Sequence, residues 1–63
     1  MTRTATPADF KVTAKFFDNE GHEIYIIGKI DDGIWTARMW DGSRLIGDFA
    51  MFEGEARFYK VLA

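Results

Sequence analysis

The chain has 63 residues, of which 48% are hydrophobic and 16% aromatic, with no cysteine and one histidine. This length allows only one small domain, and the composition excludes disulfide bonds and thiolate metal sites. A chain this short buries about 60% of its unfolded surface, so we expect tight aromatic packing or a second chain to stabilise it. Ten acids and eight bases give a formal net charge of −2, a total that argues against a nucleic-acid or membrane-surface protein.

The N-terminal segment differs in composition from the rest of the chain. Residues 1–9 mix threonine, alanine and one proline and have no apolar stretch typical of a signal peptide. We expect them to form a flexible tail and residues 10–63 to form the domain. No window approaches the roughly 18 apolar residues of a membrane span. The absence of cysteine and of a targeting segment predicts a cytoplasmic location.

Four glycine-containing segments divide the chain, at residues 19–21, 31–33, 41–43 and 53–55. Asn-Gly and Asp-Gly neighbourhoods between alternating apolar runs are strong hairpin signals, because glycine tolerates the positive φ of such turns. The segments between them are rich in β-branched and aromatic residues and alternate in polarity, which is typical of half-buried strands. These predicted strands are residues 10–18, 22–30, 34–40, 44–52 and 56–63. We therefore predict an all-β fold, a five-stranded antiparallel meander.

Hairpins of ordinary loop length place apolar residues opposite apolar residues, so that one continuous face forms the core. The predicted partners on this face are Phe16 with Ile24, Phe10 with Ile30, Ile26 with Met39, Ile30 with Trp35, Trp35 with Phe49, Met39 with Leu45, Met51 with Ala56, Phe49 with Phe58, and Leu45 with Leu62. Lys60 is the one charged residue on the face, and we expect it at an edge with its ammonium group reaching water.

The same register defines a second face with an unusual mixture of residues. An apolar cluster crosses its middle, formed by Tyr25, Ile27, Trp40, Ile46, Tyr59 and Val61. Its charged residues are the bases Lys11, Lys15, Lys29, Arg38, Arg44 and Arg57 and the acids Glu23 and Asp48. Six bases minus two acids leave a local excess of +4, while most other acids lie in or beside the turns. The predicted second face is therefore aromatic and basic.

A sheet with two partly apolar faces cannot leave both of them in water, and it has two ways to avoid this. It can curl into a small barrel, or it can form half of a sandwich in a symmetric dimer. Because Trp, Tyr and Arg are enriched at interface hot spots, we predict a non-catalytic interaction module that forms a homodimer or binds a partner protein. The predicted binding residues are Tyr25, Arg38, Trp40, Arg44, Arg57 and Tyr59. The alternative is single-stranded nucleic-acid binding on the same face, with bases stacked on aromatic side chains.

The sequence contains no pattern of residues that predicts catalysis or metal binding. The paired carboxylates, Asp31 with Asp32 and Glu53 with Glu55, flank turn glycines, where solvated side chains are typical. His22 follows a turn glycine without an evident partner, and Ser43 lies in a turn outside a nucleophile-elbow pattern. We expect no enzyme activity, no cofactor and no metal site.

Overall fold

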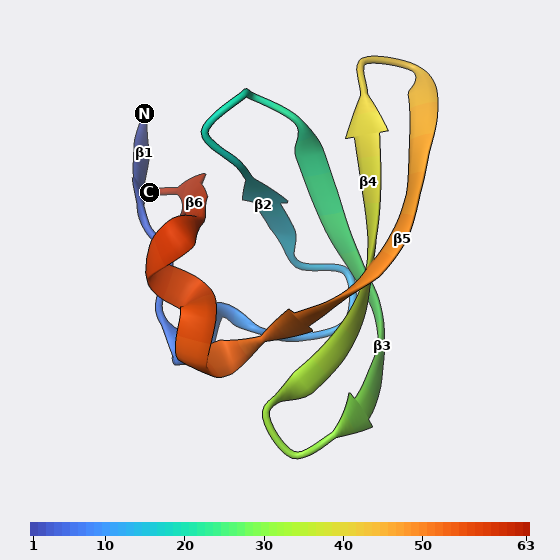
Figure 1. The fold of residues 1–63 in the computed structure, drawn as a ribbon. Coiled ribbons are helices and arrows are strands. Elements are labelled where there is room, and N and C mark those ends of the chain that lie inside the picture. The colour runs from blue at the N-terminus through green and yellow to red at the C-terminus, as the bar shows by residue number, and fades with distance from the viewer.

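The computed structural model describes residues 1–63 and contains one six-stranded antiparallel sheet with two short 3-10 helices (Figure 1). In chain order the elements are β1 (Thr2–Thr4), η1 (Pro7–Asp9), β2 (Lys15–Phe17), β3 (Glu23–Asp31), β4 (Ile34–Asp41), β5 (Arg44–Phe52), η2 (Glu53–Phe58) and β6 (Lys60–Leu62). The strand order is β1-β6-β2-β3-β4-β5, so β2 to β5 form a meander and β6 inserts between β1 and β2. The predicted all-β antiparallel fold is confirmed, with six strands in place of five.

Three of the four predicted turns are confirmed. Gly33 and Gly42 have φ values of +73° and +62° in the β3–β4 and β4–β5 turns, a conformation that glycine adopts without steric cost. The hairpin predicted at residues 53–55 is wrong, because the chain forms η2 there. As a result, β6 pairs with β1 and contacts β2, far from β5.

Three β-bulges and a β4–β5 turn that is one residue shorter than predicted change the predicted register. Phe16 faces Ile24 as predicted, but shifts follow Ile26 and Lys29 in β3, and another separates Met39 from Trp40 along the β4–β5 ladder. The predicted partners of β4 are therefore wrong. Ala37 faces Ile26 and Phe49, Met39 faces Ile24 and Gly47, and Trp35 faces Lys29 and Met51. A bulge inserts one residue into one strand, so the remaining pairs move along the ladder.

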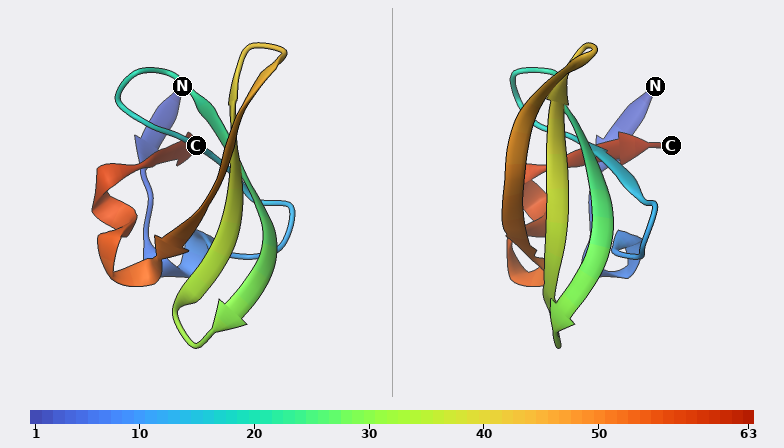
Figure 2. Two further views of the ribbon diagram at one scale, coloured as in Figure 1. Left: turned by 45° about the vertical axis from the view of Figure 1, so that its right-hand side comes forward. Right: turned by 90° about the vertical axis from the view of Figure 1, so that its right-hand side faces the viewer.

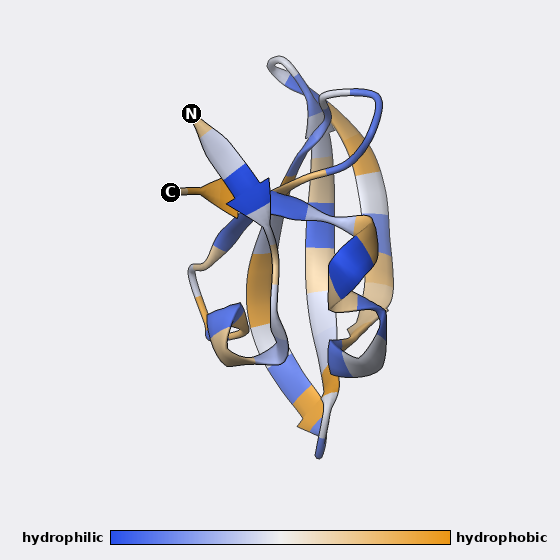
Figure 3. Cartoon of the chain, turned by 90° about the vertical axis from the view of Figure 1, so that its left-hand side faces the viewer, coloured by the Kyte–Doolittle hydropathy of each residue, from blue (hydrophilic) through white to orange (hydrophobic).

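The core lies on one face of the sheet, the inner face, which η1, η2, β1 and β6 cover (Figure 3). Its largest fully buried side chains are Phe16, Ile24, Ile26 and Met51. The other buried residues are Ala5, Phe10, Trp35, Ala37, Ala56 and Val61. The Phe10 and Phe16 rings are 4.9 Å apart between centroids, within the range in which aromatic pairs attract each other beyond simple burial.

Several apolar residues predicted in the core lie outside it. Ile30, Leu45, Phe58 and Leu62 are 59%, 49%, 53% and 60% exposed, because the bulges and η2 turn them away from the inner face. Conversely, Val61, predicted on the second face, is buried in the core.

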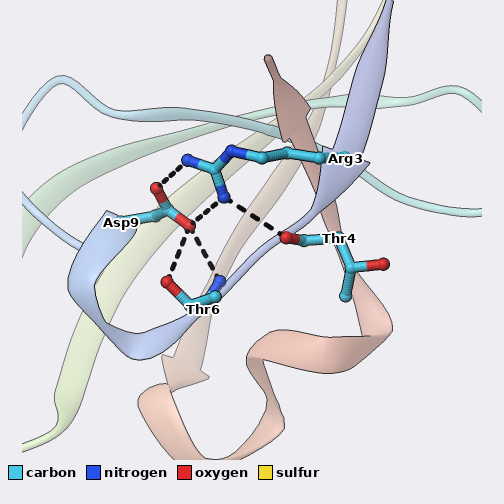
Figure 4. Close-up of polar contacts among 4 residues, drawn as sticks. All are labelled: Arg3, Thr4, Thr6 and Asp9. Atoms are coloured by element: carbon cyan, nitrogen blue, oxygen red, sulfur yellow. Dashed lines mark hydrogen bonds and ion pairs between the residues drawn. The ribbon is translucent and has the colours of Figure 1, made fainter.

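Residues 1–9, for which we expect a flexible tail, contain β1 and η1. Thr2–Thr4 form β1, which pairs with β6, and Ala5 is buried. The guanidinium group of Arg3 donates to both carboxylate oxygens of Asp9, at 2.9 and 2.6 Å (Figure 4). The same carboxylate accepts the backbone N–H of Thr6 at 2.8 Å and its hydroxyl group at 3.1 Å. Asp9 therefore ties β1 to η1.

The sheet curls into a half-barrel that does not close. Its two edge strands, β1 and β5, do not pair, and η2 contacts both of them. Lys60, predicted at an edge, lies beside β1 and donates to the hydroxyl group of Thr4 at 3.2 Å. The elements near the two termini, β1, η1, η2 and β6, lie on the inner side of the long strands β3, β4 and β5 (Figure 2). The other side of these strands is uncovered.

Candidate functional site

The candidate site is the uncovered side of the sheet, which we call the outer face. It consists of cross-strand rows in which the side chains point away from the core. One row is Lys15, Tyr25, Arg38 and Asp48, and the next is Phe17, Glu23, Trp40 and Leu45. The others are Gly28, Thr36 and Ala50, followed by Asp31, Ile34 and Phe52. None of these residues is buried. The outer face is therefore accessible along β2 to β5.

Arg38 and Asp48 form a bidentate ion pair across β4 and β5. Arg38 Nε donates to Asp48 Oδ1 at 2.8 Å and Nη2 donates to Oδ2 at 3.1 Å. These hydrogen bonds lower the pKa of Asp48 and raise that of Arg38. Both groups stay ionised at neutral pH, and the fork geometry fixes the plane of the guanidinium group.

Lys15 makes a second ion pair at the other end of the same row. Its Nζ atom lies 3.0 Å from Glu23 Oε2, and this interaction raises the pKa of Lys15. The ammonium group also lies 5.2 Å from the ring centroid of Phe17 and 5.7 Å from that of Tyr25, within cation–π distance. Lys15 thus holds two outer-face rings in a defined arrangement.

The outer face contains a group of aromatic and aliphatic side chains. Four aromatic side chains project from it, on four different strands: Phe17, Tyr25, Trp40 and Phe52. Leu45, Ile46 and Phe52 on β5 are 49%, 51% and 42% exposed. Grouped exposed apolar side chains of this kind are typical of interaction surfaces.

The charge balance of the outer face corrects the predicted basic face. Lys15 and Arg38 are balanced by Glu23 and Asp48, and Asp31 opposite Ile34 adds one negative charge, so the net formal charge of the rows is −1 instead of +4. Lys29 instead lies beside the buried Trp35, with Nζ 5.3 Å from the ring centroid. The remaining bases lie outside the rows: Lys11 before β2, Arg44 at the start of β5 and Arg57 in η2.

The structure brings together three of the six predicted binding residues. Tyr25, Arg38 and Trp40 share the outer face, with Tyr25 directly opposite Arg38. Arg44 faces Asp41 at the β4–β5 turn, beyond the bulge.

The other two predicted binding residues lie apart from the outer face. Arg57 belongs to η2, where it donates to the carbonyl oxygen of Gly54 at 2.9 Å. Tyr59 packs against the core, with its ring edge-on to Phe16 at 6.2 Å, and burial raises the pKa of its hydroxyl group. The prediction that all six residues share one face is therefore wrong.

Sequence reasoning missed the ion pair between Arg38 and Asp48 because the predicted β3–β4 and β4–β5 registers are displaced. Under the predicted register Arg38 would face Ile46, and Tyr25 would face Trp40. Two bulges in β3 move Tyr25 opposite Arg38. Asp48 moves opposite Arg38 for two reasons, a β4–β5 turn one residue shorter than predicted and the bulge in β5. The residues inserted at the bulges are isoleucines. Isoleucine is typical of regular strands, so the alternation of apolar residues does not reveal the bulges.

No pocket and no cluster of three or more His, Cys, Asp or Glu residues suited to a metal ion is present. His22 does have a partner, because its Nδ1 atom lies 2.8 Å from Asp18 Oδ2 in the β2–β3 loop. No helix of the structure has the length and apolar character needed to cross a membrane. Comparison with known proteins finds no matching family, no matching curated protein and no matching solved structure.

Proposed function

We propose that this protein is a non-catalytic interaction module that binds a protein chain, either its own second copy or another protein, through the outer face. The observation that supports this proposal is that the outer face is uncovered and aromatic and has its two bases paired with acids, whereas the core occupies the inner face. Aromatic residues and Arg are enriched at protein interfaces, whereas unpaired charge is depleted there. The expected setting is the cytoplasm, which rests on the cysteine-free sequence.

The paired charges favour a protein partner over single-stranded nucleic acid. Binding to phosphates requires Lys and Arg side chains that are free to replace counterions. On the outer face, the Lys15 and Arg38 side chains are already paired with Glu23 and Asp48. A nucleic acid would have to displace these acids or lie against them.

The test compares two outer-face variants with one control. Trp40→Asp places a charge in the row of Phe17 and Leu45, and Tyr25→Asp places one in the adjacent row on β3. Phe58→Asp is the matched control, because Phe58 is 53% exposed on η2, away from that face. Self-association or capture of a partner protein should be lost in the first two variants and kept in the control. Binding that survives both outer-face variants, or a salt-sensitive complex with an oligonucleotide in place of a protein, would contradict the proposal.

A further inference from the structure

We infer that the occupant of the outer face is a second copy of this chain, related by a two-fold axis that runs along the strands between β3 and β4. This inference rests on the proposed function, because it names the partner of the same surface. The inference rests on self-complementarity. Residues of the outer face on β2 and β3 can form attractive contacts with residues on β4 and β5 of the second copy.

The geometry follows from the row of Lys15, Tyr25, Arg38 and Asp48 on four neighbouring strands. Strands are spaced by about 4.8 Å, so the row spans about 14 Å and its midpoint lies between β3 and β4. When two faces dock, a two-fold axis in the plane of contact brings each side of the row against the opposite side of its copy. Lys15 then meets Asp48 of the second copy, and Tyr25 meets Arg38.

Both contacts in this row are attractive. Lys15 keeps Glu23 and Asp48 keeps Arg38 within each chain. The ammonium group of Lys15 then lies beside the Asp48 carboxylate of the second copy, so no acid is displaced, and the symmetry produces this contact twice. Arg38 already uses Nε and Nη2 within its own chain, so the flat side of its guanidinium group remains free. A guanidinium group stacks well on a tyrosine ring, which is what the axis places opposite it.

The neighbouring row is complementary under the same axis. It contains Phe17, Glu23, Trp40 and Leu45 on the same four strands. Phe17 would meet Leu45 of the second copy in an apolar contact. Trp40 would meet Glu23, where an indole N–H can donate to a carboxylate as Trp35 does to Glu53 within the chain at 2.8 Å. One axis therefore satisfies all four positions of both rows.

A dimer of this kind would cover a moderate share of the chain's surface. A standard interface buries about 800 Å² on each partner, roughly a fifth of the 4117 Å² exposed by this chain. Twisted sheets that stack face to face keep their strands within about 30° of each other, as an axis along the strands requires. Docking would also give a small domain the second layer that its size makes valuable.

The test is a charge exchange that only the proposed pairing rescues. Lys15→Glu alone sets the introduced carboxylate against Asp48 of the second copy, and Asp48→Lys alone sets the introduced ammonium group against Lys15. Each single variant should lose dimer affinity by at least about tenfold. An equimolar mixture of the two should dimerise again, because both of its cross-chain contacts are then between opposite charges. Sedimentation equilibrium measures the three samples together with the wild type.

Rescue also controls for folding, because an unfolded variant cannot dimerise in the mixture. The changes create like-charge neighbours within each chain, at Glu23 and at Arg38, so thermal unfolding should accompany the measurement. If a single variant fails to fold, Lys15→Gln and Asp48→Asn replace it, and each should weaken the dimer. A wild type that stays monomeric at about 100 µM, or a dimer that all four variants leave intact, overturns the inference.

Failure of self-pairing is distinguishable from failure of the proposed function. A monomeric wild type that captures a different protein, and loses it on Trp40→Asp but not on Phe58→Asp, leaves the interaction module standing and removes the symmetric dimer. A dimer that forms without the outer face, for example by strand addition at the edge of β5, would survive Trp40→Asp and would contradict both.

Discussion

The indole N–H of Trp35 donates a hydrogen bond to the carboxylate of Glu53 at 2.8 Å, across 18 residues of sequence. The backbone N–H of Glu53 donates to the carbonyl oxygen of Gly33 at 2.9 Å. These two bonds attach the start of η2 to the β3–β4 hairpin. They give a physical reason why the chain leaves the sheet after Phe52 instead of turning into another hairpin.

Removing the Glu53 carboxylate should destabilise the protein. In Glu53→Ala the buried indole loses its acceptor, which costs about 1–3 kcal/mol of unfolding free energy. Glu53→Gln keeps an acceptor oxygen and should cost less. Urea unfolding followed by Trp35 fluorescence in a Trp40→Phe background measures both. Equal stability of the alanine and glutamine variants would show that the hydrogen bond does not hold η2.

Two isoleucines on β3 should respond oppositely to truncation. Ile24 is fully buried and Ile30 is 59% exposed, although alternation alone places both in the core. Ile24→Ala should cost about 2–5 kcal/mol, the usual penalty for a buried cavity. Ile30→Ala should stay within about 0.5 kcal/mol of the wild type. Urea unfolding of the pair tests the bulged register, and a comparable loss in both variants would contradict it.

The turns could be predicted from the sequence because each depends on local chemistry. Gly33 and Gly42 occupy positive φ in turns, which few other residues tolerate. The bulges and η2 could not be predicted in this way. Residues 56–63 fit a strand pattern, and the bonds that begin η2 come from Trp35 and Gly33, distant in sequence. Such tertiary contacts override local preference.

The candidate site was only partly predictable for the same reason. Tyr25, Arg38 and Trp40 share a face because side chains alternate between the two faces along β3 and β4. This alternation could be predicted from the sequence. Tyr59 depends on the path after η2, which carries it to the core beside Phe16.

The ion pair between Arg3 and Asp9 should hold β1 in place. Asp9→Asn loses the charged acceptor shared by Arg3 and Thr6, so Thr2–Thr4 and Ala5 should exchange their amide hydrogens faster. The amide of Ala37 in β4 should be unaffected. Hydrogen exchange followed by NMR measures both regions. Asp41→Asn, in an exposed turn, is the control, and unchanged exchange in β1 would show that Asp9 is not needed.

Acid should weaken the same contact. Hydrogen bonds from Arg3 hold the pKa of Asp9 well below its usual value. A carboxylate with a lowered pKa adds stability above its unfolded pKa of about 3.9, and this is lost as pH falls through the folded value. The melting temperature of the wild type should therefore fall more steeply below about pH 4 than that of Asp9→Asn. Parallel curves for the two proteins would exclude the contact as a source of acid sensitivity.

His22 should titrate above its ordinary pKa. The Asp18 carboxylate accepts from the His22 ring at 2.8 Å and raises the pKa of His22. Partial burial opposes ionisation of Asp18, but hydrogen bonds from the His22 ring and from the backbone amides of His22 and Glu20 outweigh it and lower the pKa of Asp18. Because the folded state favours the imidazolium, its stabilisation is complete below the unfolded pKa of about 6.5. It is lost as pH rises through the raised folded value.

NMR titration of the imidazole protons tests this directly. Asp18→Asn keeps an oxygen that can accept the two backbone amides but removes the negative charge, so the pKa of His22 should return toward about 6.5. The variant isolates the ring contact from the turn, since the Asn side chain still supports the loop. Stability of the wild type should decline as pH rises above about 6.5, and His22→Gln should remove that decline because the variant has no imidazole to titrate. A His22 pKa at or below the ordinary value in the wild type would show that the Asp18 contact does not persist in solution.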